Sequence, residues 1–308
     1  MSTLRALSFV LGTFCCLTAN AGARQCEDAT SCVTTDSWHL AVALGAGVRL
    51  SPLVDGDNFP LVVLPDLAYY GKQFYWDNTE VGYQWYNNDT WSIETFIKVN
   101  SERTLFSVWN VDNFLAATLD SSESVVEDGS GDFMGLIGGG ARLVQPPEEE
   151  LTLSSDYISI EQVAKRDWAY DAGVRLHVYH DDAEWTFALY NDLSSTYSGK
   201  HAEVGYKFGF NWGQWHINPT LSLAWKSSEL TNYYYGLDAR DGVFPFQFYS
   251  GKSGWQPGVK VVASKPINSE WSWLVIASYQ QLHRGMRRSP LVRRNNIVSA
   301  FAGVSYRF

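Results

Sequence analysis

The chain has 308 residues and a formal net charge of −10, an acidic balance that argues against binding to nucleic acid. Its mean hydropathy is −0.18, and no stretch beyond the first residues approaches an apolar spanning helix, which argues against a helical membrane protein. The 13 Trp, 17 Tyr and 16 Phe, with 25 Gly, fit two classes, a membrane β-barrel with aromatic girdles and a large secreted β-sandwich.

The first residues have the pattern of a cleaved secretory signal. Arg5 gives a positive start, 6–17 is an apolar run, and Ala21-Gly22-Ala23 has the small residues of a cleavage site. An uncleaved membrane anchor would need roughly 20 apolar residues. A lipid anchor is disfavoured because a phenylalanine precedes the first of the two cysteines in this run. We therefore assign 1–23 as a signal peptide.

The next segment, 24–37, is interpreted as an N-terminal periplasmic stretch. Cys26 and Cys32 frame a short polar loop in it. A disulfide is the default for such a pair in an oxidising compartment. A structural zinc site would need further ligands nearby, and none is visible, so we predict no metal and no cofactor.

From residue 38 onward the dominant pattern has period two, as expected of strands whose alternate side chains face opposite sides. In the first such segment Leu40, Val42 and Leu44 alternate with smaller or polar residues, and the last segment repeats the division up to Phe308. The alternating segments lie at about 40–49, 60–70, 73–85, 91–100, 170–178, 184–192, 202–210, 215–225, 257–265, 271–282 and 298–308.

The strands of a soluble sandwich also alternate apolar and polar side chains, but three features indicate that residues 38–308 form a barrel. The segments run to about 9–13 residues, the length of a tilted membrane strand. Aromatic residues such as Trp185, Trp215 and Trp271 stand at strand ends on the apolar face. The terminal strand also carries Tyr306 and Phe308, which resembles the recognition signal for barrel insertion. We predict an all-β, antiparallel transmembrane β-barrel of the outer membrane.

The strand count follows from the segments and from a parity rule. Including 231–237 gives about twelve strands, and ten is the second choice. Bacterial barrels have even numbers of strands and both termini in the periplasm. Counting back from Phe308, we expect 283–295 to be extracellular and 266–269 to be periplasmic.

The segment 101–166 departs from this pattern. It is acidic and irregular, with Glu123, Glu127, Asp128, Asp132 and the run 148–150. A structureless connection of this length is unusual in a compact domain. We interpret 101–166 as an acidic insert that forms an extra hairpin, a plug or a folded loop.

Charged residues of both signs fall on the inward, lumen-facing set of the predicted strands. In a narrow barrel such charges would pair and fill part of the lumen, and we favour this structural network over a small polar pore. The set comprises Arg49, Glu94, Lys98, Asp171, Arg175, Glu203, Lys207, Lys260 and Arg307.

Four short segments, in order, resemble the MipA/OmpV family, the MltA-interacting outer-membrane proteins. They are Gly45-Ala46-Gly47-Val48 with the following Ser51-Pro52 and Val63-Leu64-Pro65, Tyr233-Tyr234-Tyr235-Gly236-Leu237, Ser289-Pro290-Leu291-Val292, and Gly303-Val304-Ser305-Tyr306-Arg307-Phe308. The resemblance covers most of 38–104 and 167–308. The acidic 105–165 region looks like an insertion, and the arginines around Ser289 stand where the family is often acidic.

This resemblance implies a role without catalysis in the envelope of a Gram-negative cell. The family's name-giving member bridges a lytic transglycosylase to a murein synthase, so a peptidoglycan scaffold is the first hypothesis. A porin-like passive channel for small polar solutes and a surface adhesin are the alternatives.

The arginines of 283–295 have a physical interpretation of their own. Guanidinium groups pair bidentately with phosphate, so an extracellular cluster would suit lipopolysaccharide. A solvated loop that partly neutralises the acidic insert is the equal alternative. The cluster comprises Arg284, Arg287, Arg288, Arg293 and Arg294.

Lipid-hydrolysing barrels motivate a search for a histidine followed two residues later by a serine. His216 has Asn218 at that position, and an amide cannot serve as the nucleophile. His177 is followed by Tyr179 instead. We therefore predict that the chain is not an enzyme.

Overall fold

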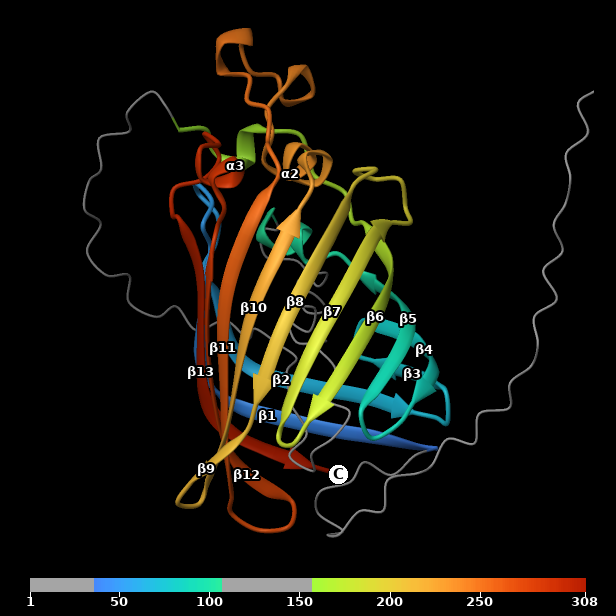
Figure 1. The fold of residues 1–308 in the computed structure, drawn as a ribbon. Helices are drawn as coiled ribbons and strands as arrows, with labels where there is room; N and C mark the ends of the chain where they lie inside the picture. The colour runs from blue at the N-terminus through green and yellow to red at the C-terminus, as the bar shows by residue number, and fades with distance from the viewer. Residues whose placement is uncertain (1–35, 107–156) are drawn as a thin grey trace, which may run out of the picture.

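The computed structural model describes residues 36–106 and 157–308, in which one antiparallel sheet curls into a barrel (Figure 1). The predicted signal peptide, the Cys26 and Cys32 pair and most of the acidic insert lie outside the described residues. The strands are β1 (Ser37–Leu50), β2 (Phe59–Tyr70), β3 (Phe74–Asp77), β4 (Glu80–Asn87), β5 (Trp91–Val99), β6 (Tyr170–His180), β7 (Ala183–Asp192), β8 (Lys200–Phe208), β9 (Phe210–Trp212), β10 (Trp215–Lys226), β11 (Gly254–Pro266), β12 (Trp271–Gln281) and β13 (Asn296–Arg307).

The barrel is closed, and it has twelve strands. Each strand pairs with its neighbour in the chain, β10 pairs with β11, and β1 pairs with β13 to complete the ring. The short β9 continues β8 after Gly209, and both pair with β10, so they occupy one position in the ring. The predicted fold class and the preferred strand count are thus confirmed.

The β1–β13 pairing forms a closing seam between the two ends of the described barrel. Gly45 lies opposite Gly303 in this seam. A Cβ atom on Gly303 would stand 2.2 Å from the carbonyl oxygen of Leu44, and the ring of Phe301 lies over the same spot. Only glycine fits so close an approach of two backbones.

The count of twelve arises from two local differences that cancel. The stretch 73–85 forms two strands rather than one, because Asn78 takes the left-handed conformation (φ 47°) and turns the chain between β3 and β4. Conversely, the prediction of a strand at 231–237 is wrong. That stretch lies mostly in helix α2 (Ser228–Tyr235), which the Ser227 side chain caps by accepting from the amide of Leu230.

The two ends of the barrel differ in their connections. One end, here called the turn end, holds the start of β1, the end of β13 and all the short turns except that between β3 and β4. The other, the loop end, carries five long connections at 51–58, 100–169, 193–199, 227–253 and 282–295.

The loop end also holds every helix of the described residues. The amide of Asn100 donates to the carbonyl of Ala169 at 2.8 Å, so the acidic insert leaves and re-enters the barrel at this end. No helix in the described ranges is long and apolar enough to cross a membrane. Besides α2, the helices of the loop end are η1 (Ser101–Phe106), η2 (Ile160–Gln162), η3 (Ala239–Asp241), η4 (Pro245–Gln247) and α3 (Arg284–Arg287).

The outer surface of the barrel is an apolar belt. On β1, Trp38 and Leu44 are 54% and 48% exposed, whereas Ala43, on the other face, is fully buried. Aromatic rings in mutual contact gather near the turn end on the outer face, as expected where strands cross a lipid–water interface. Such pairs include Trp38–Tyr69, Trp185–Tyr206 and Trp271–Tyr306.

Candidate functional site in the barrel lumen

The lumen has two unlike walls. One wall, formed by β1, β2 and β11 to β13, holds a cluster of buried apolar side chains. The other, formed by β3 to β8, carries buried charge. The apolar cluster comprises Ala43, Leu61, Leu64, Val262, Leu274, Ile276 and Phe301.

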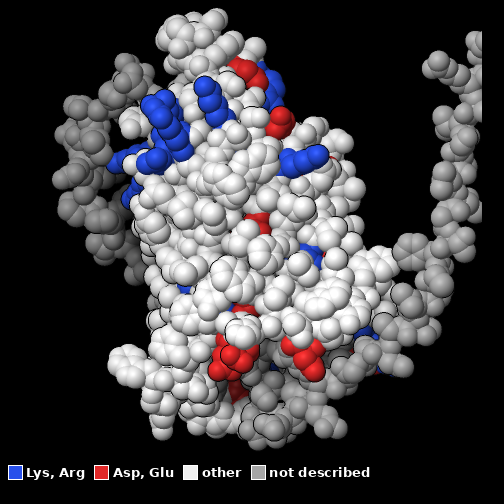
Figure 2. Space-filling model, in the orientation of Figure 1, with Lys and Arg blue, Asp and Glu red and all other residues white. Residues whose placement is uncertain are grey.

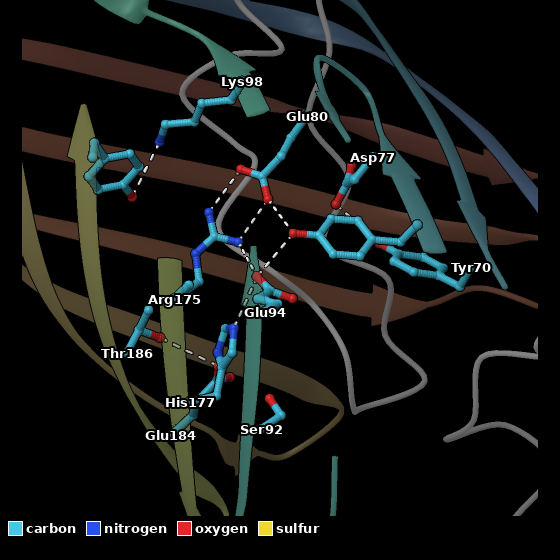
Figure 3. Close-up of polar contacts among 12 residues, drawn as sticks. Tyr70, Asp77, Glu80, Ser92, Glu94, Lys98, Arg175, His177, Glu184 and Thr186 are labelled. Carbon is cyan, nitrogen blue, oxygen red and sulfur yellow. Dashed lines mark hydrogen bonds and ion pairs between the residues drawn. The ribbon is translucent and has the colours of Figure 1, made fainter. Parts of the chain in front are cut away.

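The charged wall centres on Arg175 of β6, whose side chain is 1% exposed. Its guanidinium donates from both terminal nitrogens to Glu80 of β4, each at 2.8 Å, and from Nη1 to Glu94 of β5 at 2.6 Å (Figure 3). The Tyr75 hydroxyl contacts the same two carboxylates at 2.7 and 3.0 Å. The ring of Phe96 lies 4.1 Å from the guanidinium carbon. One arginine thereby ties three neighbouring strands together.

A histidine extends this network towards the turn end. His177 Nδ1 lies 2.5 Å from a carboxylate oxygen of Glu184, and its Nε2 lies 3.4 Å from Glu94 (Figure 3). Two carboxylates therefore fix the ring from opposite sides. The nearby Ser92 is fully buried, and its hydroxyl lies 3.0 Å from the hydroxyl of Tyr179. These contacts join side chains of β5, β6 and β7 within the wall.

Five loops converge on the loop end and form an apolar cluster, here called the cap. Each loop contributes at least one buried side chain, namely Leu53, Leu105, Tyr197, Tyr234 and Met286. Tyr234 and Met286 are completely buried. Because water is excluded from these contacts, the cap binds the loops to one another rather than leaving them to move separately.

Polar contacts anchor the cap to the barrel. Glu102 of η1 is ion-paired with Lys226 at the end of β10, and it accepts from the Tyr235 hydroxyl at 2.6 Å. Burial alone would raise the pKa of Glu102, but Lys226 and Tyr235 together hold the pKa of this carboxyl below its ordinary value. A second buried pair, Arg166 with Asp241 at 2.7 Å, ties the end of the insert to η3.

Beneath the cap the lumen holds a cavity of about 140 Å³. Helix α2 contributes Leu230 to it, and strands on both walls contribute polar side chains. Four of the charged residues singled out by the sequence line it: Lys98, Asp171, Glu203 and Lys260.

The other predicted lumen-facing charges lie elsewhere. Glu94 and Arg175 belong to the network described above. Arg49 is near the loop end, where its Nη1 donates to Thr104 at 3.4 Å. Lys207 is half-buried, and Arg307 is exposed next to the turn end. Near it, the rings of Tyr306 and Phe308 stand 4.9 Å apart on the last strand.

The five arginines of 283–295 are all exposed and lie in or beside α3 along the chain, and basic side chains gather at the upper part of the molecule in Figure 2. Their backbone is held firmly, because Met286 and Leu291 are buried in the cap and the amides of Arg293 and Arg294 both donate to the carbonyl of Pro52. The loop thus presents its guanidinium groups from a fixed base.

Several residues of the site escaped the sequence analysis. Glu80 is not among the predicted lumen-facing charges, because the sequence predicts one strand over 73–85 and gives no sign of the turn at Asn78. Glu102 and Lys226 gave no signal at all, since their pairing joins positions 124 apart in the chain. The described residues contain no group of three His, Cys, Asp or Glu side chains placed to hold a metal ion.

A closed antiparallel barrel with an apolar belt and a polar lumen defines the class of integral outer-membrane proteins. The model of the family "MltA-interacting protein MipA" matches residues 44–308. The chain belongs to that family, which confirms the resemblance found in the sequence.

Individual proteins and one solved structure are similar to this chain. The "Putative outer membrane protein YiaT" of Escherichia coli K12 is 28% identical over 169 residues, which are 53% of this chain and 66% of that protein. The "MltA-interacting protein" of the same strain is 24% identical over 197 residues, 57% of this chain and 76% of that protein. Among solved structures, a NanC porin aligns with a TM-score of 0.40 at 10% identity, covering 87% of this chain and all of that one.

The Arg175 network gives a test of what holds the charged wall. Arg175→Met leaves Glu80 and Glu94 buried without their counter-charge, so we expect the free energy of unfolding to fall by about 3–5 kcal/mol. Adding Glu80→Gln and Glu94→Gln should restore a large part of the loss, because no charge then stays uncompensated. Urea unfolding of refolded protein, followed by Trp fluorescence, measures both. The exposed Arg307→Met is the control, and an equal loss there would contradict the assignment.

Proposed function

We propose that this protein is a docking protein of the cell envelope, a closed outer-membrane barrel that holds murein-remodelling enzymes near the membrane. The partners would be a lytic transglycosylase and, through it, a murein synthase. Membership of the family named for interaction with MltA supports the proposal.

The charge at the turn end is the observation that carries this proposal. Short turns of outer-membrane barrels face the periplasm, where murein enzymes work. Three of the turns carry exposed carboxylates, and acidic side chains gather towards the lower edge of the molecule in Figure 2. They would steer and hold a partner with a basic surface. The exposed carboxylates of these turns belong to Asp89, Asp181, Asp182 and Glu270.

The cap favours a docking role over a passive channel. Five loops pack over the loop end through fully buried side chains, and conduction would require this cluster to separate. We therefore expect refolded full-length protein to give no discrete conductance steps in planar lipid bilayers. The variant Tyr235→Ala, which removes a completely buried ring from the cap, should conduct if the cap closes the lumen. Stable steps from the unaltered protein would favour the channel instead.

Neutralising the acidic turns tests the docking surface directly. Asp89→Asn, Asp181→Asn, Asp182→Asn and Glu270→Gln together should lower recovery of the transglycosylase from solubilised, cross-linked membranes several-fold. Asn is tolerated at Asp181, whose φ is +50°. The matched control neutralises exposed acids of the loop end, Asp55→Asn, Asp57→Asn and Glu229→Gln. Equal recovery with both sets, or no murein enzyme with the unaltered protein, would refute the proposal.

The loop arginines would serve the opposite face of the membrane. Long loops of such barrels are extracellular, where lipopolysaccharide phosphates lie, and none of the five guanidinium groups has an ion pair within the described ranges. Changing Arg284, Arg287 and Arg288 to Gln should reduce the lipopolysaccharide that copurifies with the protein. The control changes Lys72, Lys265 and Arg307 to Gln, all away from the loops. If both triple variants retain the same lipid, the loop makes no specific contact.

A further inference from the structure

The cavity beneath the cap has the composition of a binding site rather than of a packing defect. Three lysines reach it from different strands, Lys98 from β5, Lys226 from β10 and Lys260 from β11. Hydroxyl groups of Thr220, Ser222 and Ser278 share the same lining. Cavities of about 150 Å³ can hold a ligand the size of benzene, so the space of about 140 Å³ suits a molecule of about six heavy atoms.

The three ammonium groups differ in what they contact. Lys226 is ion-paired with Glu102, and Lys98 lies over the ring of Tyr190, with its Nζ 4.4 Å from the ring centre. Lys260, on the opposite wall, has no hydrogen bond or ion pair with another described residue, and its strand holds it half-buried in the lumen. A positive charge therefore remains available inside the cavity.

The carboxylates of the cavity are already occupied. Asp171 accepts from the Asn100 amide at 2.7 Å and from the Tyr197 hydroxyl at 2.5 Å. Glu102 is held by Lys226 and Tyr235, and Glu203 also has an interaction of its own. Among the described residues that line the cavity, no carboxylate is left to pair with Lys260, so this part of the lumen favours a bound anion.

Unsatisfied polar atoms near the cavity support the same conclusion. Gln256 is completely buried, and neither its amide nitrogen nor its oxygen has a hydrogen-bond partner. It lies on the same face of β11 as Gly258 and Lys260, both of which line the cavity. His201, another lining residue, has an Nδ1 atom without a hydrogen bond. Buried polar groups are costly to leave unpaired, and a polar ligand in the cavity would satisfy the His201 nitrogen, which lines it.

We propose that the cavity is a binding site for a small hydroxylated carboxylate anion. Lys260 provides the principal counter-charge to the carboxylate, Lys98 adds positive charge from the facing wall, and the serine and threonine hydroxyls accept and donate to the hydroxyl of the ligand. This site is independent of the proposed docking surface, because it lies in the lumen and none of the acidic turn residues lines it.

Lactate, a hydroxycarboxylate of six heavy atoms, is the probe for this site, and lactamide is its uncharged counterpart. Refolded full-length protein in detergent micelles at low salt would be titrated with each, and binding read by saturation-transfer NMR and calorimetry. We expect lactate to bind and lactamide to bind at least tenfold more weakly. Equal binding of the two, or no binding of lactate, overturns the proposal.

Variants of the lysine locate the site. Lys260→Met keeps the length of the stem and removes the charge, and it should weaken lactate binding at least tenfold. Lys260→Arg keeps the charge and should retain most of the affinity. The matched control is Lys265→Met, on the same strand but outside the cavity lining. Unchanged affinity in Lys260→Met, or an equal loss in Lys265→Met, refutes the assignment. If Lys260→Met does not fold, the affinities of Lys260→Arg for lactate and for lactamide test the proposal, and equal affinities would refute it.

Discussion

Every strand of this protein has to satisfy two solvents at once. In hydrocarbon no backbone amide can be left unpaired, so the sheet must close, and closure forces alternate side chains into a narrow lumen. The outward-facing side chains contact lipid and are apolar. The inward set cannot remain a row of isolated charges, and the arrangement around Arg175 follows from that constraint. One guanidinium between Glu80 and Glu94 pairs with both carboxylates and joins each strand to the next.

The lumen and its cap form a continuous interior. The apolar wall of β1, β2 and β11 to β13 faces the charged wall, and above them the loops pack as a small globular core would. Glu102 and Lys226 join the loops to the barrel at the level of the cavity. The loop end thus owes its order to burial and to a few polar anchors, while the barrel owes its order to the hydrogen-bonded ladder.

Much of the fold can be predicted from the sequence because period two is imposed twice, by lipid outside and by the lumen inside. Alternation is therefore clear in segments such as 202–210 and 215–225. The pattern fails to predict the structure where neither lipid nor the lumen constrains the side chains. At 231–237 the run of three tyrosines looks like a strand, yet it is a capped helix whose rings fill the cap. Near Asn78 a single left-handed residue splits one predicted strand into two.

The site was harder to predict than the fold. Alternation placed Glu94 and Arg175 on one face, but nothing local says which inward charges meet. Arg175 and Glu80 are 95 positions apart, and their contact depends on the register of three strands. The cavity is less predictable still, because it is defined by side chains from seven strands and two helical segments that no sequence window contains.

The closing seam has a consequence for how the chain reaches its final form. All other neighbours in the ring are consecutive along the chain, whereas β1 and β13 come from its two extremes. Until they meet, both present open edges with unpaired amides, which invite pairing with other chains. Such long-range closure is slow compared with hairpin formation. The glycines at the seam carry no side chains that would obstruct the pairing of β1 with β13. This last pairing step, in which mispairing is most harmful, therefore meets little steric hindrance.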